Sequence, residues 1–253
     1  LGTSIDIRAP LSLKTKRIDI LLFEQGLAET RERAKALVMQ GWVFADGQRV
    51  NKPGNSVNPM AEIEVRGKLQ YVGRGGIKLS HALQFFSLTV EDKIALDVGA
   101  STGGFTDCLL QRGASHVYAL DVGKGQIEYS LRKDPRVKVL EGYNARYTFS
   151  LPETVDIATV DVSFISLTKV LCSVASHVKP HSHIICLVKP QFEAKRSEVA
   201  RGGVIRNPIV HAVVLGRTIA WCLNNNFRLL NMTPSPITGN SGNREFFLLL
   251  QRS

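Results

Sequence analysis

The chain has 253 residues, of which 44% are hydrophobic and 21% are charged, so it is an ordinary globular protein with room for one large domain or a small and a medium one. No apolar run approaches the roughly 20 residues of a membrane-spanning helix, and no secretory signal is visible. The net charge of +10 favours a polyanionic partner, although solubility or attraction to a membrane surface also explains such a charge. Four widely spaced cysteines indicate buried thiols in a reducing, cytoplasmic compartment rather than disulfides or a metal site.

The amino-terminal part of the chain predicts a small α+β unit. An apolar helical face begins at Ile18, and a second helix is capped by Thr30 and closed by Gly41. Asp46-Gly47 is a strong hairpin signal, and an alternating strand at 61–65 closes the unit. Two short helices on a small twisted sheet form a plausible module of marginal stability.

This order of elements resembles the RNA-binding domain first described in small-subunit ribosomal protein four, on Arg17-Ile18-Asp19, Gly26-Leu27-Ala28, Asp46-Gly47 and Pro53-Gly54. The resemblance implies RNA contacts through cations of the second helix and the hairpin edge. The matching residues are Arg17, Arg31, Arg33, Lys35 and Lys52. Without this resemblance, the cations of the second helix would be interpreted as a solvent-exposed face of the helix. Residues 1–67 carry a net charge of only +2, so the rest of the chain must supply much of the phosphate contact.

After a linker rich in glycine and cations, strands and helices alternate to the end of the chain. Arg74 in this linker is a further candidate RNA contact. The alternation predicts a Rossmann-like α/β domain with a mostly parallel, seven-stranded sheet. The predicted strands are 94–98, 117–121, 137–140, 155–160, 183–188, 227–233 and 244–251, with helices at 77–86 and 208–225 among those between them. Polar, glycine-containing stretches at 191–207 and 233–243 predict loops.

The segment 94–106 predicts a buried strand, a glycine turn and the start of a helix. Such a turn presents backbone N–H groups and a helix N-terminus to a nucleotide-like ligand. Asp121 ends the next predicted strand, about where an acidic residue meets a ribose in such units, roughly 20 residues on. The motif alone is explained equally well by a turn that merely packs a helix on a strand.

Four ionisable residues fall at or near the carboxyl ends of predicted strands, where open parallel sheets place their sites. Asp161 and Lys189 each follow a strand, Glu245 opens the last strand, and Lys78 starts the helix after the linker. Two lysines and two carboxylates that converge there could hold an alcohol in position beside a lysine. Taken one by one, each is explained as a solvated strand-end charge, so the shared placement is what favours a site.

The stretch from Asp97 to Asp107, Asp-Val-Gly-Ala-Ser-Thr-Gly-Gly-Phe-Thr-Asp, resembles the S-adenosylmethionine loop of FtsJ-type ribose 2′-O-methyltransferases. The order Lys78, Asp161, Lys189, Glu245 matches that group's Lys-Asp-Lys-Glu tetrad. With the small RNA-binding domain in front, the chain is similar to the haemolysin A (TlyA) family of ribosomal RNA methyltransferases. The expected division is a flexible or non-native start at 1–15, an RNA-binding domain at 16–67, a linker at 68–76 and a methyltransferase domain at 77–253.

The resemblance implies S-adenosylmethionine as cofactor and ribosomal RNA or ribosomal subunits as substrate, with 2′-O-methylation of a cytidine ribose. Lys189 would accept or steer the hydroxyl proton. A free lysine is protonated at neutral pH, so this role needs Lys78 nearby or burial. Asp161 and Glu245 would orient the two ammonium groups. The residues expected at the cofactor are Asp97, Gly99, Ala100, Ser101, Thr102, Gly103, Gly104, Phe105, Asp121, Asn144 and Asp161.

Several alternatives remain at this stage. Asn144 is equally well explained as a turn residue. An NAD-dependent oxidoreductase would carry Gly-x-Gly-x-x-Gly, whereas this chain has Gly-x-x-x-Gly-Gly. A non-catalytic RNA- or ribosome-binding protein and a haemolysin acting on membranes are the other two. No metal is expected, and the chain is expected to be a monomer or a homodimer.

Overall fold

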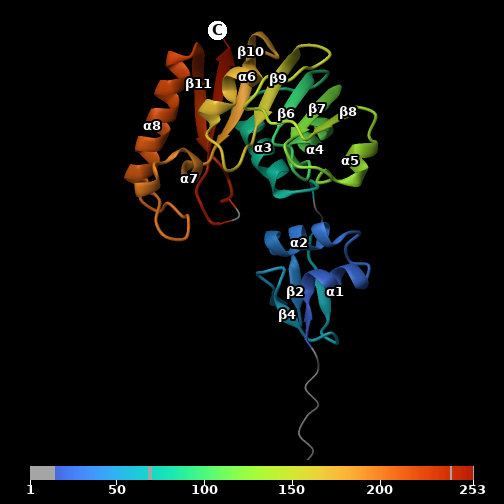
Figure 1. Ribbon diagram of the computed structural model, residues 1–253. Helices are drawn as coiled ribbons and strands as arrows, with labels where there is room; N and C mark the ends of the chain where they lie inside the picture. Colours follow the sequence, from blue (N-terminus) through green and yellow to red (C-terminus); the bar gives the residue numbers. More distant parts are fainter. Residues whose placement is uncertain (1–14, 68–69, 240, 253) are drawn as a thin grey trace, which may run out of the picture. The chain divides into compact units, whose positions relative to one another are not determined.

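The computed structural model describes residues 15–67, 70–239 and 241–252 (Figure 1). The chain divides into two compact units between Leu69 and Gln70. Nearly all of the expected start at 1–15 lies outside the described residues, as does Asn240.

The first unit consists of two helices and short strands, as expected. Its elements are β1 (Lys16–Arg17), α1 (Ile18–Glu24), α2 (Arg31–Gln40), β2 (Val43–Ala45), β3 (Gln48–Arg49), β4 (Ser56–Val57) and β5 (Ile63–Val65). β1 pairs with β4, and the other three strands form a sheet in the order β3-β2-β5. The core gathers apolar side chains from both helices and from β2, among them Ile18, Leu22, Val38 and Val43.

Local chemistry explains the boundaries of these elements. The Thr30 hydroxyl accepts a hydrogen bond from the Arg33 N–H at 3.1 Å and so caps α2. Gly41 ends the helix with a φ of +75°. Asp46 and Gly47 both have positive φ between β2 and β3, which is the conformation that a two-residue hairpin of this twist requires.

The second unit is a seven-stranded sheet covered by helices on both faces (Figure 1). Its elements are α3 (Arg74–Phe85), β6 (Ile94–Val98), α4 (Gly104–Gln111), β7 (His116–Asp121), α5 (Tyr129–Lys133), β8 (Val137–Glu141), β9 (Val155–Val160), α6 (Leu171–Ala175), β10 (Val178–Val188), α7 (Pro190–Glu193), α8 (Pro208–Asn224), β11 (Phe227–Pro234) and β12 (Phe246–Arg252). The strand order is β11-β12-β10-β9-β6-β7-β8. β12 runs antiparallel to both of its neighbours, β10 and β11, so it is the one described strand of this sheet that runs against the rest.

The strands of this sheet alternate between two apolar cores. Ala95 and Ala119 belong to the core that Leu79 of α3 and Leu109 of α4 complete. The next residues along the same strands, among them Leu96 and Leu120, belong to the core on the other face, with residues of α6 and α8. Because both faces are buried, the central strands read as nearly continuous apolar runs.

The structure corrects three boundaries. α3 begins at Arg74, inside the expected linker, because the residues before it pack on the second unit: Tyr71 is buried and the Val72 N–H donates to Asp107 at 2.8 Å. β10 begins at Val178, five residues before the predicted 183, and an irregularity between Val178 and His183 hides its polar start from pattern analysis. β12 begins at Phe246, two residues after the predicted 244.

All four cysteines are free, but one prediction about them is wrong. Cys108, Cys186 and Cys222 are buried, whereas Cys172 is exposed on the short helix α6. The described residues hold no group of three or more metal-ligating side chains that could bind an ion. Across the same residues, every helix is too short or too polar to cross a membrane.

Candidate active site

The loop between β6 and α4 lies at the carboxyl edge of the sheet. Gly99 and Gly103 in it have φ angles of +84° and +95°. A Cβ on Gly99 would collide with the Asp161 carbonyl oxygen, and one on Gly103 would collide with the Leu131 side chain. A Cβ on Gly104 would lie 3.0 Å from the Gly76 nitrogen. Glycine is therefore required here for conformation and for close approach of the backbone.

Asp97 lies beneath this loop and not on it. Its side chain is fully buried and accepts hydrogen bonds from the hydroxyls of Thr106 at 2.7 Å and Thr159 at 2.9 Å. Burial raises the pKa of this carboxyl to about 7. Asp97 thus ties β6 to α4 and β9, and its expected role at the cofactor stays a prediction. The two threonines were missed as partners of Asp97, although Thr159 stands between the apolar residues Ala158 and Val160.

The other loop residues differ in exposure. Ser101 and Thr102 are exposed, whereas Ala100 and Phe105 are buried, and the Phe105 ring packs 6.2 Å from that of Phe247. Only the backbone of Phe105 is therefore placed to meet a ligand at the loop.

Asp121 ends β7 beside the loop and holds it. Its carboxylate accepts hydrogen bonds from the Ser101 and Gly123 N–H groups, each at 2.7 Å. Asn144 lies in an exposed turn after β8, where its side chain accepts from the Arg146 N–H at 3.0 Å. The preceding residue, Tyr143, donates its N–H to the Asp121 carbonyl at 3.1 Å. The structure therefore brings Asp121, Asn144 and the glycine loop to one edge.

The sheet brings the four ionisable residues to that same edge. Asp161 follows β9 directly, and its N–H donates to the Val98 carbonyl at 2.9 Å. In the antiparallel pair of β10 and β12, Val188 is opposite Phe246, so Lys189 and Glu245 stand one position beyond paired residues. Lys78 reaches the edge from α3.

These four residues form two ion pairs. Lys189 Nζ lies 2.7 Å from Asp161 Oδ1 and donates to the Ser163 hydroxyl at 2.8 Å. Lys78 Nζ lies 2.6 Å from Glu245 Oε2. The exposed fractions of the Lys78 and Glu245 side chains are 9% and 3%. Charges this buried require partners, and each lysine has one. Ser163 was missed as a contact, although it stands two residues after Asp161.

Two loops far apart in sequence are hydrogen-bonded to the segment that precedes Glu245 or to each other. The buried side chain of Asn243 accepts from the Ile205 N–H and donates to the Gly203 carbonyl, both at 2.9 Å. Arg74 donates to the Thr238 carbonyl at 2.6 Å, so this candidate RNA contact is engaged within its own unit. A Cβ on Gly239 would collide with the Glu245 carboxylate.

Most candidate RNA contacts of the first unit are also paired within the protein. Arg17 forms two hydrogen bonds with the buried carboxylate of Asp19, at 2.9 and 3.0 Å, and Arg31 approaches the same carboxylate at 3.5 Å. The Arg17 guanidinium lowers the pKa of Asp19. Arg33 and Lys35 pair with glutamates at 3.7 and 3.5 Å, and Lys52 is exposed.

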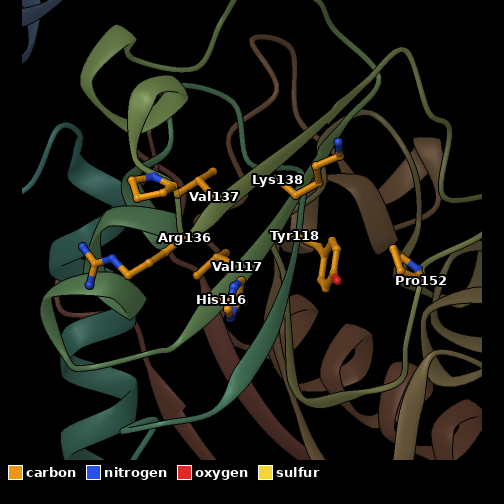
Figure 2. A pocket seen from close by; sticks show the side chains of 8 residues that line it. His116, Val117, Tyr118, Arg136, Val137, Lys138 and Pro152 are labelled. Atoms are coloured by element: carbon orange, nitrogen blue, oxygen red, sulfur yellow. The ribbon is translucent and has the colours of Figure 1, made fainter.

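A pocket of the second unit lies at the opposite edge of the sheet. Figure 2 shows its lining side chains, which come from the amino-terminal ends of β7 and β8 and from the loop at Pro152. They include Tyr118 and Lys138 but none of the four ionisable residues or the glycine loop. This pocket is therefore separate from the candidate active site.

Comparison with protein families identifies both units. An FtsJ-like methyltransferase model matches residues 71–252, and an S4 domain model matches residues 16–63. YqxC of Bacillus subtilis is 47% identical to this chain, over 95% of this chain and 87% of its own length. The 16S/23S rRNA (cytidine-2′-O)-methyltransferase TlyA of Mycobacterium tuberculosis is 41% identical, over 93% of this chain and 89% of its own length.

Solved structures agree with these matches. A hemolysin-named structure from Streptococcus thermophilus is 43% identical, with a TM-score of 0.75 over 96% of this chain and 90% of the other. An S-adenosylmethionine-dependent methyltransferase from Listeria monocytogenes, at 16% identity and a TM-score of 0.52 over 70% of this chain and 98% of its own, shares the fold of the second unit. This chain belongs to the TlyA family of FtsJ-like methyltransferases, with an S4 domain preceding the methyltransferase domain.

Proposed function

We propose that this protein methylates the 2′-hydroxyl of a cytidine ribose in ribosomal RNA, using S-adenosylmethionine. The observation that carries the proposal is the pair of buried lysine–carboxylate contacts, Lys189–Asp161 and Lys78–Glu245, beside a glycine loop at the carboxyl edge of the sheet. The family supports methyl transfer, and the name of the Mycobacterium tuberculosis relative supports cytidine 2′-O as the position.

The residues present fit the proposed cofactor. At Gly99, Gly103 and Gly104 a Cβ would meet the protein's own atoms, so glycine is what lets the backbone of this loop pack tightly at the carboxyl edge of the sheet. Asp121, at the end of β7, stands where a ribose hydroxyl pair would be bound, and Asn144 lies in the turn beside it. When bound, S-adenosylmethionine supplies an already electrophilic methyl group.

The protein's remaining tasks are to align the ribose hydroxyl and to remove its proton. Holding the oxygen in line with the methyl group is a proximity effect, worth up to roughly 7–11 kcal/mol. We assign Lys189 to this hydroxyl, because its Nζ is fixed from two sides by Asp161 and Ser163. Lys189 can accept the hydroxyl proton only as a neutral amine, so its own ammonium proton must leave to solvent before the ribose hydroxyl is deprotonated.

Lys78 and Glu245 form the second part of the proposed site. Glu245 stands next to Lys189 across the β10–β12 pair and neutralises Lys78. We expect Glu245 to orient the Lys78 ammonium group in this site.

The S4 domain supports RNA as the substrate. A ribosomal protein uS4 of Staphylococcus aureus is 43% identical to this chain over 58 residues. Because Arg17, Arg31, Arg33 and Lys35 have carboxylate neighbours, we expect phosphates to compete with these carboxylates for the cations. We place the reaction on ribosomes or their subunits in the cytoplasm.

The decisive experiment is transfer of radiolabelled methyl from S-adenosylmethionine to isolated bacterial ribosomal subunits and to naked ribosomal RNA, with Lys189→Ala alongside. Incorporation that makes one linkage resistant to alkaline hydrolysis, and that is absent from the variant, would establish ribose methylation. Normal transfer by Lys189→Ala with unchanged cofactor binding would refute the assigned role. Binding of RNA without incorporation would favour the non-catalytic alternative.

A further inference from the structure

Two segments that carry the proposed catalytic residues are linked by a carboxylate outside the tetrad. The first, 161–170, follows β9 and contains Asp161 and Ser163. The second, 189–194, follows β10 and contains Lys189. Since Lys189 must reach both residues of the first segment, the distance between the two segments determines where its Nζ lies.

Glu193 bridges these segments. Its carboxylate accepts hydrogen bonds from the Ser166 hydroxyl at 2.6 Å and from the Leu167 N–H at 2.7 Å. Leu167 is itself buried in the core, so the bridge is fixed at that end. The rings of Phe164 and Phe192 add a second contact between the segments, with centroids 5.0 Å apart.

Glu193 is connected rigidly to Lys189. The Phe192 N–H donates to the Lys189 carbonyl at 2.9 Å, and the Ala194 N–H donates to the Pro190 carbonyl at 2.8 Å. These bonds close α7 into a single turn that follows Lys189, its N-cap residue. A displacement of the Glu193 end therefore moves the lysine backbone.

Keeping a carboxylate in the buried surroundings of Glu193 costs free energy, and a purely structural role does not explain that cost. Burial raises its pKa, against the opposing effect of the two hydrogen bonds. Within the described residues no lysine or arginine forms an ion pair with it. The titratable groups that sense its charge are the buried thiols Cys186 of β10 and Cys222 of α8. If the side chain only had to fill this space, an apolar residue would cost less free energy than a buried carboxylate.

We propose that Glu193 is a positioning residue of the methyl-transfer site, which sets the separation of the two segments so that Lys189 meets Asp161 and Ser163. The inference rests on the proposed function of Lys189. Within the described part of the second unit, the Glu193 carboxylate accepts its hydrogen bonds from Ser166 and Leu167, which lie outside the glycine loop. Its loss should therefore reduce the rate of transfer and leave the binding of both substrates unchanged.

The test compares Glu193→Ala and Glu193→Gln with the unmodified full-length chain, using radiolabelled methyl transfer to isolated ribosomal subunits. Misplacing a reacting group by about 1 Å costs roughly 100-fold, so we expect Glu193→Ala to lower kcat by about 10- to 100-fold. KM for the subunits and Kd for S-adenosylmethionine should change less than about threefold, which is under 1 kcal/mol. Glu193→Gln keeps one acceptor for the Leu167 N–H and should recover most of the rate.

Ser166→Ala removes the bridge from its other end and serves where Glu193→Ala does not fold. It should lower kcat in the same direction, and its effect should not add to that of Glu193→Ala in the double variant. Glu198→Ala is the matched control, because this nearby carboxylate pairs with Arg217 instead. A wild-type kcat in both Glu193→Ala and Ser166→Ala would overturn the proposal, as would a loss confined to KM. If Lys189→Ala retains activity, the proposed function itself fails, whereas an inactive Lys189→Ala beside fully active bridge variants rejects the positioning role alone.

Discussion

Lys78 Nζ lies 2.6 Å from Glu245 Oε2, although 167 positions separate the two residues in the chain. The contact connects α3, which begins the second unit, to β12, which ends it. Both side chains are almost completely buried. The pair is therefore a structural contact and a candidate part of the catalytic machinery at the same time, and these two roles can be separated by experiment.

Removing one partner of this pair should destabilise the protein strongly. Glu245→Ala leaves a buried ammonium without a counter-charge, and we expect a loss of about 3–5 kcal/mol in the free energy of unfolding. The double variant Lys78→Met with Glu245→Leu should regain most of that stability, because apolar side chains of similar volume replace the pair. Urea unfolding measures both. Methyl transfer should remain absent from the double variant, and substantial activity in it would remove the pair from the mechanism.

The glycine loop should not tolerate a side chain at Gly99. Gly99→Ala combines a φ of +84° with a collision against the Asp161 carbonyl oxygen. We expect at least about tenfold weaker S-adenosylmethionine binding in isothermal titration, since the loop must shift by several tenths of an ångström to admit the methyl. Gly202→Ala is the control, because Gly202 also has positive φ but open space around it. Its cost should be confined to backbone strain of about 1 kcal/mol. Equal cofactor affinity in the two variants would contradict the assignment of the loop.

Asp97 should make the stability of the protein depend on pH. Burial raises its pKa to about 7 in the folded chain, from an ordinary value of 3.8. A raised folded-state pKa means that the stabilising contribution of the neutral carboxyl is complete below about pH 4 and is lost as the pH rises toward 7. Asp97→Asn cannot ionise. Relative to wild type, this variant should therefore gain stability between pH 4 and pH 8 in urea unfolding. A constant difference between the two proteins across that range would show that Asp97 ionises freely in the fold.

Asp19 should organise the RNA-facing cations of the first unit. Its buried carboxylate holds Arg17 and approaches Arg31, so Asp19→Ala leaves both guanidinium groups without this anchor. We expect a loss of about 1–3 kcal/mol in stability, typical of a hydrogen bond to a charged group. RNA affinity should fall even though the variant is more positively charged, because the cations are no longer held in place. Filter binding to naked ribosomal RNA at two salt concentrations, with Glu24→Ala matching the charge change, measures this. An affinity increase equal in both variants would show that net charge alone matters.

Local sequence determined most of the individual elements. Asp46-Gly47 and Gly41 specify positive φ, and Thr30 specifies a cap, because these requirements act over a few neighbouring residues. Apolar runs buried on both faces predicted β6 and β9 with their observed bounds, 94–98 and 155–160. The start of β10 departs furthest from the prediction. The first half of β10 is polar, and its pairing with β9 is irregular. No apolar pattern in the sequence therefore marks where this strand begins.

The contacts that define the candidate site were decided by the tertiary structure. The sequence places Lys78, Asp161, Lys189 and Glu245 near strand or helix ends, but it does not say which carboxylate meets which lysine. That pairing follows from the strand order and from the antiparallel insertion of β12 beside β10. The anchoring position of Asp97 and the bridge made by Glu193 were likewise absent from any local pattern. Hydrogen bonds and ion pairs between distant segments depend on how those segments pack, whereas helix caps, turns and buried strands depend on neighbouring residues alone.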